Sequence, residues 1–153
     1  MNCLSFDVGG TAVKYGVIDE SYKILKKDKI PTPKNEEKFI DFLSNIIQDN
    51  LSNISQVSVA MPGYVNSADN KYLYGPHLQF DIDFSKLSNF TDYKFHLDND
   101  GNVAAYCEYF LNYKNKYSNL IMLTFGTGVG GGIISEGRLL RGRGNAGEIG
   151  HML

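Results

Sequence analysis

Alternating and periodic apolar positions divide the chain into short strand-like runs and longer helical runs. A buried run over residues 3–8 and an alternating run over residues 11–19 flank Gly9 and Gly10, a pattern that predicts a β-hairpin. The run over residues 22–32, polar on one side and ending at Pro31, predicts a third strand. The chain is therefore expected to begin with three strands.

Between residues 35 and 51 the apolar period becomes that of an amphipathic helix. Asn35 is the expected N-cap, and two glutamates follow it in the first turn. Residues 64–94 show no clear pattern. The other expected elements are strands at 57–61, at 94–98, at 119–126 and after the glycine-rich loop, and a helix at 101–113.

This order of elements predicts an α/β fold with a mixed β-sheet flanked by helices. It differs from the strict alternation of strands and helices in a doubly wound dehydrogenase. A domain boundary is expected near residues 114–118, because the hairpin motif starts again after them.

Composition narrows the setting. The chain is 42% hydrophobic and 21% charged with a net charge of −2, which is typical of globular proteins and gives no basic surface for nucleic acid or an anionic membrane. No signal peptide and no apolar run of ~18 residues is visible, so we expect a cytoplasmic protein. Cys3 and Cys107 are expected as reduced, buried thiols.

A glycine-rich segment begins Gly126-Thr127-Gly128-Val129-Gly130-Gly131 and satisfies the G-x-G-x-x-G pattern of dinucleotide-binding folds. That pattern requires a helix after the glycines, whereas the residues that follow here, GGIISEG, predict a strand. A Rossmann site is therefore not expected. A strand–glycine–strand hairpin that offers Thr127 and backbone amides to a phosphate remains open.

The segment Asp7-Val8-Gly9-Gly10-Thr11 suits a metal–phosphate site at the end of a buried strand. Glycines let backbone N–H groups approach an anion, the Thr11 hydroxyl can donate to phosphate, and Asp7 can hold Mg²⁺ directly or through water. A plain hairpin with a glycine turn is the alternative.

Two further sets of polar residues are candidates for chemistry. Asp100 lies between a predicted strand and a predicted helix, where it could act as a general base or simply be the N-cap of the helix. Glu148 and His151 are three residues apart, so one helical turn would place them on the same side. Taken alone, the position of Asp100 favours the N-cap, and a lone Glu/His pair is more often part of the polar surface than a binding site.

In their order along the chain, four segments resemble the ROK family of sugar kinases, within the actin-like (ribonuclease H-like) ATPase superfamily. The resemblance covers essentially the whole chain. The segments are FDVGGTAVKYGVID, VAMPGYVN, LDNDGNVAAYCE and LTFGTGVGGGIISEGRLLRGRGNAGEIGHM.

The resemblance implies a phosphoryl transfer from ATP to a sugar. It implies Asp100 as the base toward a hydroxyl, expected to be the 6-hydroxyl, of a hexose or N-acetylhexosamine. The implied sugar contacts are Asn99, Asp100, Glu148 and His151, with Gly63 at the mouth of the sugar pocket. The implied ATP-phosphate contacts are Gly9, Gly10 and Thr11 on one side and Gly126, Thr127, Gly128 and Gly130 on the other, with Asp7 near Mg²⁺.

The chain also departs from the family pattern. In the family, a cysteine cluster follows His151 and shares a structural Zn²⁺ with it, whereas this chain ends two residues later. We therefore expect an N-terminal half, with an actin-like domain at 1–117 and a truncated second one at 118–153, inactive alone. The zinc and a homodimer would belong to the full-length parent. His77 stands where the family usually has asparagine.

Two alternatives come from other functional classes. The family contains sugar-responsive transcriptional regulators, which carry a DNA-binding domain before the D-x-G-G-T motif. Only six residues precede Asp7 here, which favours the kinase. A non-catalytic sugar-binding module is the other alternative.

Overall fold

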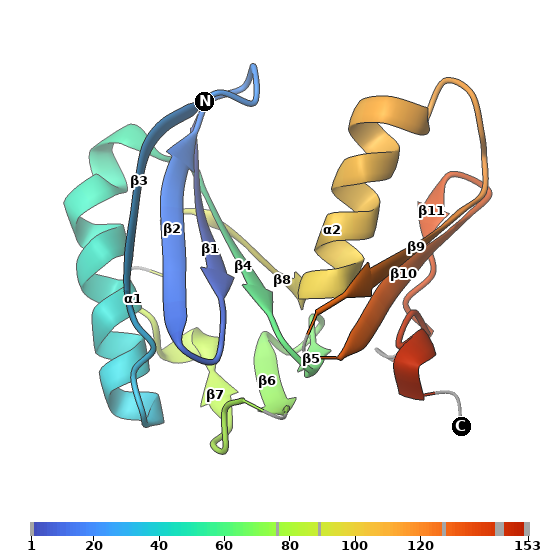
Figure 1. The fold of residues 1–153 in the computed structure, drawn as a ribbon. Helices are drawn as coiled ribbons and strands as arrows, with labels where there is room; N and C mark the ends of the chain where they lie inside the picture. Colours follow the sequence, from blue (N-terminus) through green and yellow to red (C-terminus); the bar gives the residue numbers. More distant parts are fainter. Residues whose placement is uncertain (1, 76, 89, 127, 143–145, 152–153) are drawn as a thin grey trace. The chain divides into compact units, whose positions relative to one another are not determined.

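The computed structural model describes residues 2–75, 77–88, 90–126, 128–142 and 146–151. By its internal contacts the chain forms two compact units, Met1–Asp98 and Asn99–Leu153, which we describe one at a time (Figure 1). The boundary expected at 117/118 concerns the domains of a whole kinase and stays a prediction.

The first unit is built on a five-stranded mixed sheet in the order β3-β2-β1-β4-β8. The strands β1, β2 and β3 are antiparallel neighbours, and β1 runs parallel to β4. The mixed sheet expected from the sequence is thereby confirmed. The bounds are β1 Cys3–Val8, β2 Ala12–Ile18, β3 Ile24–Pro31, β4 Gln56–Met61 and β8 Lys94–Asn99, the last residue of which is counted in the second unit.

One helix, α1 (Glu36–Asn50), covers a face of this sheet (Figure 1). Its N-cap is Asn35 as predicted, with the side chain accepting a hydrogen bond from the Lys38 N–H at 2.9 Å. Apolar residues at helical spacing on α1 pack against the inward residues of β1 and β4. These buried residues are Phe39, Ile40, Leu43 and Ile47 on the helix and Leu4, Phe6, Val8, Val57, Val59 and Met61 on the strands.

β3 differs from the other strands because nearly all of its side chains are exposed. It lies at one edge of the sheet and carries Lys26, Lys27 and Lys29. Lysines on an edge strand oppose pairing with another chain.

The segment that the sequence left without a pattern folds into a small antiparallel sheet. Its strands are β5 (Tyr64–Asn66), β6 (Lys71–Tyr74) and β7 (Ile82–Asp83), followed by a short 3₁₀ turn at Phe84–Lys86. Tyr72 is fully buried there, and its hydroxyl donates to the Leu78 carbonyl at 3.1 Å. Burial, with a smaller effect of Asp81, raises the pKa of Tyr72 to about 12.

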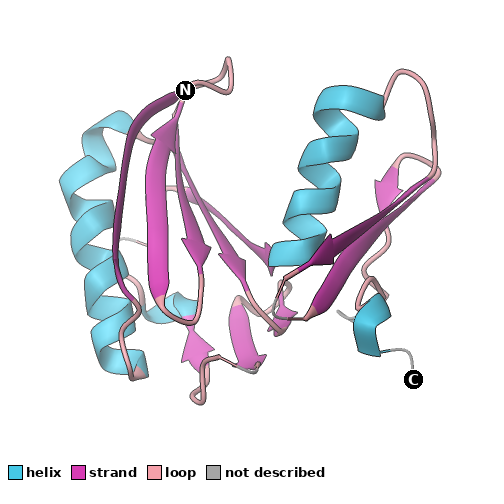
Figure 2. Ribbon diagram, in the orientation of Figure 1, coloured by secondary structure: helices cyan, strands magenta, loops and turns pink. Residues whose placement is uncertain are grey.

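The second unit combines one helix with a three-stranded antiparallel sheet in the order β11-β10-β9 (Figure 2). The elements are α2 (Asp100–Glu108), a π-helical extension (Tyr109–Tyr113), β9 (Leu120–Phe125), β10 (Val129–Ser135), β11 (Arg138–Leu139) and a 3₁₀ turn (Ile149–His151). The helix lies against β10 so closely that a Cβ on Gly132 would come within 2.5 Å of the Ala105 Cβ. The predicted helix and hairpin are confirmed.

Two smaller findings complete the fold. Cys107 is exposed and Cys3 is half-buried, so the expectation of two buried thiols is wrong. Cys107 belongs to a run of consecutive apolar residues on α2, 103–107, of which only Ala105 is buried. Among the described residues, none of the helices is both long and apolar enough to cross a membrane.

The Tyr72→Phe variant tests whether the buried hydroxyl holds the 64–87 segment. Removal of the hydroxyl leaves the Leu78 carbonyl without its donor, so we expect a loss of about 1–2 kcal/mol in the free energy of unfolding. The measurement is urea unfolding followed by tyrosine fluorescence. Tyr117→Phe, at an exposed site, is the matched control and should leave stability unchanged; equal effects of the two variants would contradict the assignment.

Candidate functional site

In the first unit, the buried residue Thr32 forms hydrogen bonds that stabilise the turn between β1 and β2. The Gly9 N–H donates to the Ala12 carbonyl at 3.0 Å, which closes the turn. The Thr32 hydroxyl donates to the Gly9 carbonyl at 2.6 Å, and the Thr32 N–H donates to the Thr11 carbonyl at 3.0 Å. Sequence reasoning missed Thr32, which is 2% exposed.

This turn keeps donors available to a ligand. Among the described residues, none accepts a hydrogen bond from the N–H of Gly10 or of Thr11. Thr11 is exposed, so its hydroxyl can also reach a bound group. A rigid turn that presents two backbone donors and a hydroxyl is suited to a phosphate.

Asp7 lies near the end of β1, opposite Lys14 on β2. The Lys14 Nζ and an Asp7 carboxylate oxygen are 3.2 Å apart, and both side chains are largely exposed. An exposed pair of this kind contributes little stability, so Asp7 can exchange Lys14 for another cation at low cost. Mg²⁺ usually keeps several waters and takes one or two protein carboxylates beside substrate phosphates, which Asp7 fits.

A cage built wholly from protein ligands is not present among the described residues, where no three His, Cys, Asp or Glu side chains cluster. The zinc implied by the family resemblance depends on His151, whose side chain lies outside the described part of the chain.

Gly63 adopts a backbone conformation that favours glycine, with φ of +91°. A Cβ there would lie 2.6 Å from the Tyr74 carbonyl oxygen and 2.7 Å from the Gly75 Cα. The loop after β4 therefore packs main chain against main chain on the segment after β6. The structure keeps Gly63 in the same unit as the Gly9–Thr11 turn.

In the second unit, Asn99 uses both atoms of its amide. The Asn99 Oδ1 accepts from the Asn102 N–H at 3.1 Å, which makes Asn99 the N-cap of α2. The Asn99 Nδ2 donates to a carboxylate oxygen of Glu148 at 2.9 Å. Asn99 is 3% exposed, so this bond fixes the Glu148 carboxylate in a sheltered position.

Asp100 is the first residue of α2 and not its N-cap, so the capping interpretation of Asp100 is wrong: the amide of Asn99 already occupies that role. The Asp100 side chain is exposed, and its Oδ1 accepts from the Gly101 N–H at 2.8 Å. The N-terminus of a helix favours the ionised form of a carboxylate. An ionised, accessible carboxylate meets the first requirement of a general base.

Backbone contacts bring the Asn99 and Glu148 segments together. A Cβ on Gly101 would lie 2.6 Å from the Gly131 carbonyl oxygen, and one on Gly147 would lie 2.8 Å from the Gly132 Cα. The start of α2, the middle of β10 and the residue before Glu148 are thus in van der Waals contact. Three predicted residues, Asn99, Asp100 and Glu148, share this unit; the His151 backbone follows in the 3₁₀ turn.

The glycine loop joins β9 to β10 in a hairpin, as predicted. The Gly126 N–H donates to the Gly128 carbonyl at 2.9 Å. Gly126 and Gly128 have open space where a Cβ would stand, whereas Gly130 faces the Thr124 hydroxyl. Thr127 lies outside the described residues.

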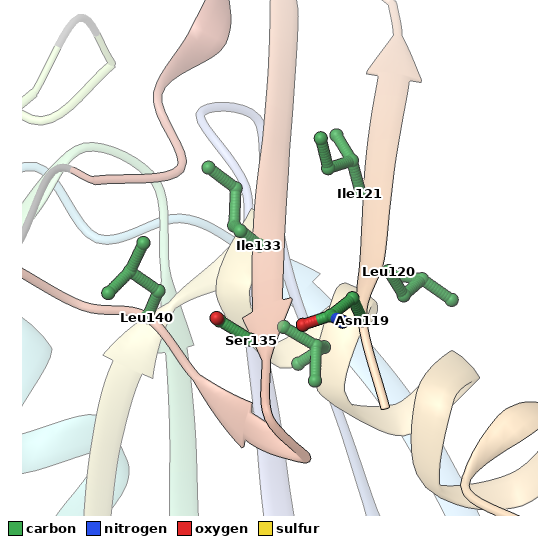
Figure 3. Close-up of a pocket in the computed structure, with 7 residues that line it drawn as sticks. Asn119, Leu120, Ile121, Ile133, Ser135 and Leu140 are labelled. Atoms are coloured by element: carbon green, nitrogen blue, oxygen red, sulfur yellow. The ribbon is translucent and has the colours of Figure 1, made fainter. Parts of the chain in front are cut away.

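A separate pocket of about 470 Å³ lies on the β9–β10 sheet (Figure 3). Ile121 and Ile133 are register partners and share one face, with Leu140 beside them in Figure 3. None of the predicted catalytic or binding residues lines this pocket. The lining residues are Asn119, Leu120, Ile121, Ile133, Ile134, Ser135 and Leu140.

The pocket continues into an exposed apolar face, which we define by Ile121, Leu123 and Phe125 on β9, together with Val129 and Leu140. Phe125 is 79% exposed and Ile121 is 67% exposed. Such contiguous apolar surface is uncommon on monomers.

We expect this face to drive self-association. The double variant Ile121→Thr/Phe125→Thr places β-branched strand formers at both positions and removes the two most exposed apolar side chains of the face, so its mass by light scattering should stay that of a monomer at concentrations where the unmodified chain associates. Leu25→Thr, at an exposed site on β3, is the control. An unmodified chain that remains monomeric at high concentration would contradict the expectation.

Comparisons with known proteins agree with this architecture. The model of the ROK family matches residues 3–153. A glucokinase from Streptomyces coelicolor is 32% identical over 97% of this chain and 49% of its own length. An N-acetylmannosamine kinase from Pasteurella multocida is 36% identical over 100% of this chain and 53% of its own length.

Among solved structures, a ROK family glucokinase from Streptomyces griseus in complex with glucose and AMPPNP superimposes with a TM-score of 0.84. It is 30% identical and covers 99% of this chain, which corresponds to 50% of that structure. The chain therefore spans about half the length of the curated relatives it matches.

The mixed sheet with its covering helix α1, followed along the chain by α2 and the β9–β10 hairpin, is that of the actin-like ATPase fold. Within that class, the chain belongs to the ROK family. Both the fold class and the family resemblance drawn from the four sequence segments are confirmed.

Substitutions at Asn99 separate its two hydrogen bonds. Asn99→Asp keeps an acceptor for the Asn102 N–H but sets a second carboxylate against Glu148, whereas Asn99→Ala removes both bonds. We expect each variant to lower the free energy of unfolding by about 1–3 kcal/mol, measured by thermal unfolding. For Asn99→Asp alone, the loss should diminish as the pH falls below about 4, because protonation of one carboxyl restores a donor.

Asn112→Asp is the matched control. The Asn112 amide also donates to a glutamate, Glu108, at 3.1 Å but in an exposed position, so its substitution should cost less than about 0.5 kcal/mol. Equal costs at the two sites would mean that the Asn99–Glu148 bond has no special role.

Proposed function

We propose that this chain is the ATP- and sugar-binding half of an ATP-dependent sugar kinase. The reaction is transfer of the γ-phosphoryl group of ATP to a hydroxyl, the 6-hydroxyl, of a hexose or N-acetylhexosamine. One observation carries the proposal: Asp100 stands exposed at the start of α2 while the adjacent Asn99 fixes the Glu148 carboxylate at 2.9 Å. Relatives that are named glucokinases and N-acetylmannosamine kinases support the class of reaction.

Each side chain of the second unit has a defined role in this proposal. The Asp100 carboxylate accepts the proton of the attacking sugar hydroxyl as the phosphoryl group is transferred. The Glu148 carboxylate, Asn99 and His151 bind sugar hydroxyls and orient the sugar ring. Orientation of a bound acceptor removes much of the entropic barrier to a bimolecular transfer.

The glycine turns bind the other substrate. Gly9, Gly10 and Thr11 donate to ATP phosphates, and Gly126, Thr127, Gly128 and Gly130 form the second phosphate loop. Mg²⁺, when bound through Asp7 and water, neutralises charge on the phosphates. Gly63 borders the sugar pocket in this proposal.

Because the chain spans about half of its relatives' length, we assign the rest of the kinase to a longer protein that includes this chain. That protein would complete the nucleotide site, hold a structural zinc with His151, form a homodimer and be located in the cytoplasm. The 153-residue chain by itself is expected to show no sugar-dependent release of ADP.

The test of the catalytic role uses a protein in which this chain is joined to the remaining half of the family fold. Asp100→Asn should reduce the sugar-dependent kcat by about 10²–10⁴-fold with a small change in sugar affinity, measured by coupled ADP release and by calorimetry. Asp92→Asn, an exposed carboxylate that has no role in the proposed site, is the control. A retained rate in Asp100→Asn would remove Asp100 from its role.

Ligand-induced stabilisation separates the alternatives. A kinase half is stabilised against heat by sugar and by ATP–Mg²⁺, whereas a non-catalytic sugar-binding module is stabilised by sugar alone. Stabilisation by sugar together with operator DNA would favour a regulator, and a panel of hexoses and N-acetylhexosamines without any effect would contradict the proposal.

A further inference from the structure

The segment after β6 touches both glycine turns of the first unit. On one side, a Cβ at Gly75 would lie 3.2 Å from the Gly63 Cα and 2.7 Å from the Pro62 carbonyl oxygen. On the other side, a Cβ at Gly10 would lie 2.8 Å from the His77 Cβ and 2.9 Å from its Cγ. The segment therefore connects the turn assigned to sugar with the turn assigned to phosphate.

The position of His77 is fixed from the residue that follows it. Leu78 is 3% exposed, and its carbonyl accepts the hydroxyl of buried Tyr72. Burial of Leu78 therefore anchors the backbone next to His77, beside the Gly10 turn. The His77 Nδ1 lies 3.2 Å from the place of a Gly10 Cβ, so the ring covers the Cα of the glycine directly.

The imidazole of His77 forms no hydrogen bond to the described residues. His77 is exposed, and among the described residues none is its hydrogen-bond partner. Both ring nitrogens are therefore available to a ligand that binds beside the Gly10 turn.

The surrounding groups indicate what kind of ligand. The N–H groups of Gly10 and Thr11 and the Thr11 hydroxyl are donors at the same turn, and Lys14 supplies a cation from β2 next to it. A neutral sugar hydroxyl needs acceptors as well as donors, whereas a phosphate oxygen needs donors only. Asp7 is the carboxylate opposite Lys14, and it fits the same site through Mg²⁺.

We infer that His77 is a phosphate-binding residue, whose imidazole N–H donates to the phosphoryl group held at the Gly9–Thr11 turn. The inference rests on the proposed function, because it takes the turn to be a phosphate site. It adds a side-chain donor to a turn that otherwise offers two backbone N–H groups and the Thr11 hydroxyl, and this donor comes from a segment that also contacts the Gly63 turn.

The test records the ring nitrogens of the histidines and the backbone amides of the ¹⁵N-labelled chain by NMR during titration with ATP–Mg²⁺ and, separately, with tripolyphosphate. The expected result is a shift of the His77 ring together with the Gly10 and Thr11 amides. His96, which is exposed on β8, is the internal control, and its ring should not shift.

Variants give an independent measurement. His77→Ala should weaken ATP–Mg²⁺ binding about tenfold, as expected for loss of one hydrogen bond to a charged group, and His77→Asn should have an intermediate effect because it keeps a donor. His96→Ala should bind as the unmodified chain does. An unchanged amide spectrum away from the turn shows that His77→Ala is folded.

The outcomes distinguish the inference from the proposed function. If the Gly10 and Thr11 amides shift while the His77 ring does not, and His77→Ala binds normally, the inference is wrong and the phosphate turn stands. If neither the amides nor the ring shift, the phosphate site at this turn is wrong and the inference fails with it.

Discussion

The arrangement of the second unit depends on one buried amide. Asn99 caps α2 with its oxygen and holds Glu148 with its nitrogen, so the residue that starts the helix also selects where a distant carboxylate lies. Because the amide is a donor at one end and an acceptor at the other, no other side chain of similar size satisfies both partners without a change of charge. Because Asn99 is the N-cap, Asp100 is the first residue of the helix, where its side chain is exposed.

Close main-chain contact is the second constraint, and glycine is the residue that permits it. At Gly101, Gly132 and Gly147 the helix, strand and following loop approach so closely that a methyl group would collide with backbone atoms or with the Ala105 Cβ. Contacts between backbones leave little room for relative adjustment, since no flexible side chain lies between them. The polar groups around Asn99 are therefore carried by rigid elements, as a binding site requires.

Sequence reasoning recovered most of the fold because its signals were local. The N-cap at Asn35, the strands of the first sheet and the hairpin after Phe125 each have a period or a turn residue that marks them. The β5–β7 sheet escaped because its strands are two to four residues long, too short for a period to appear. Thr32 and the contact of His77 with Gly10 escaped for another reason: both depend on residues far apart in the chain, and only tertiary structure brings them together. The roles of the site residues came from the family resemblance, since spacing alone left each of them open.

Two edge strands, β3 of the five-stranded sheet and β9 of the β11-β10-β9 sheet, differ in character, and this difference affects how association can proceed. The β3 edge, with Lys26, Lys27 and Lys29, resists a partner strand, whereas β9 presents an edge flanked by Ile121, Leu123 and Phe125. Two copies that meet through β9 in a two-fold arrangement each use the same edge, and neither keeps it for a third. Association through β9 alone therefore ends at a closed pair and does not propagate into a fibre.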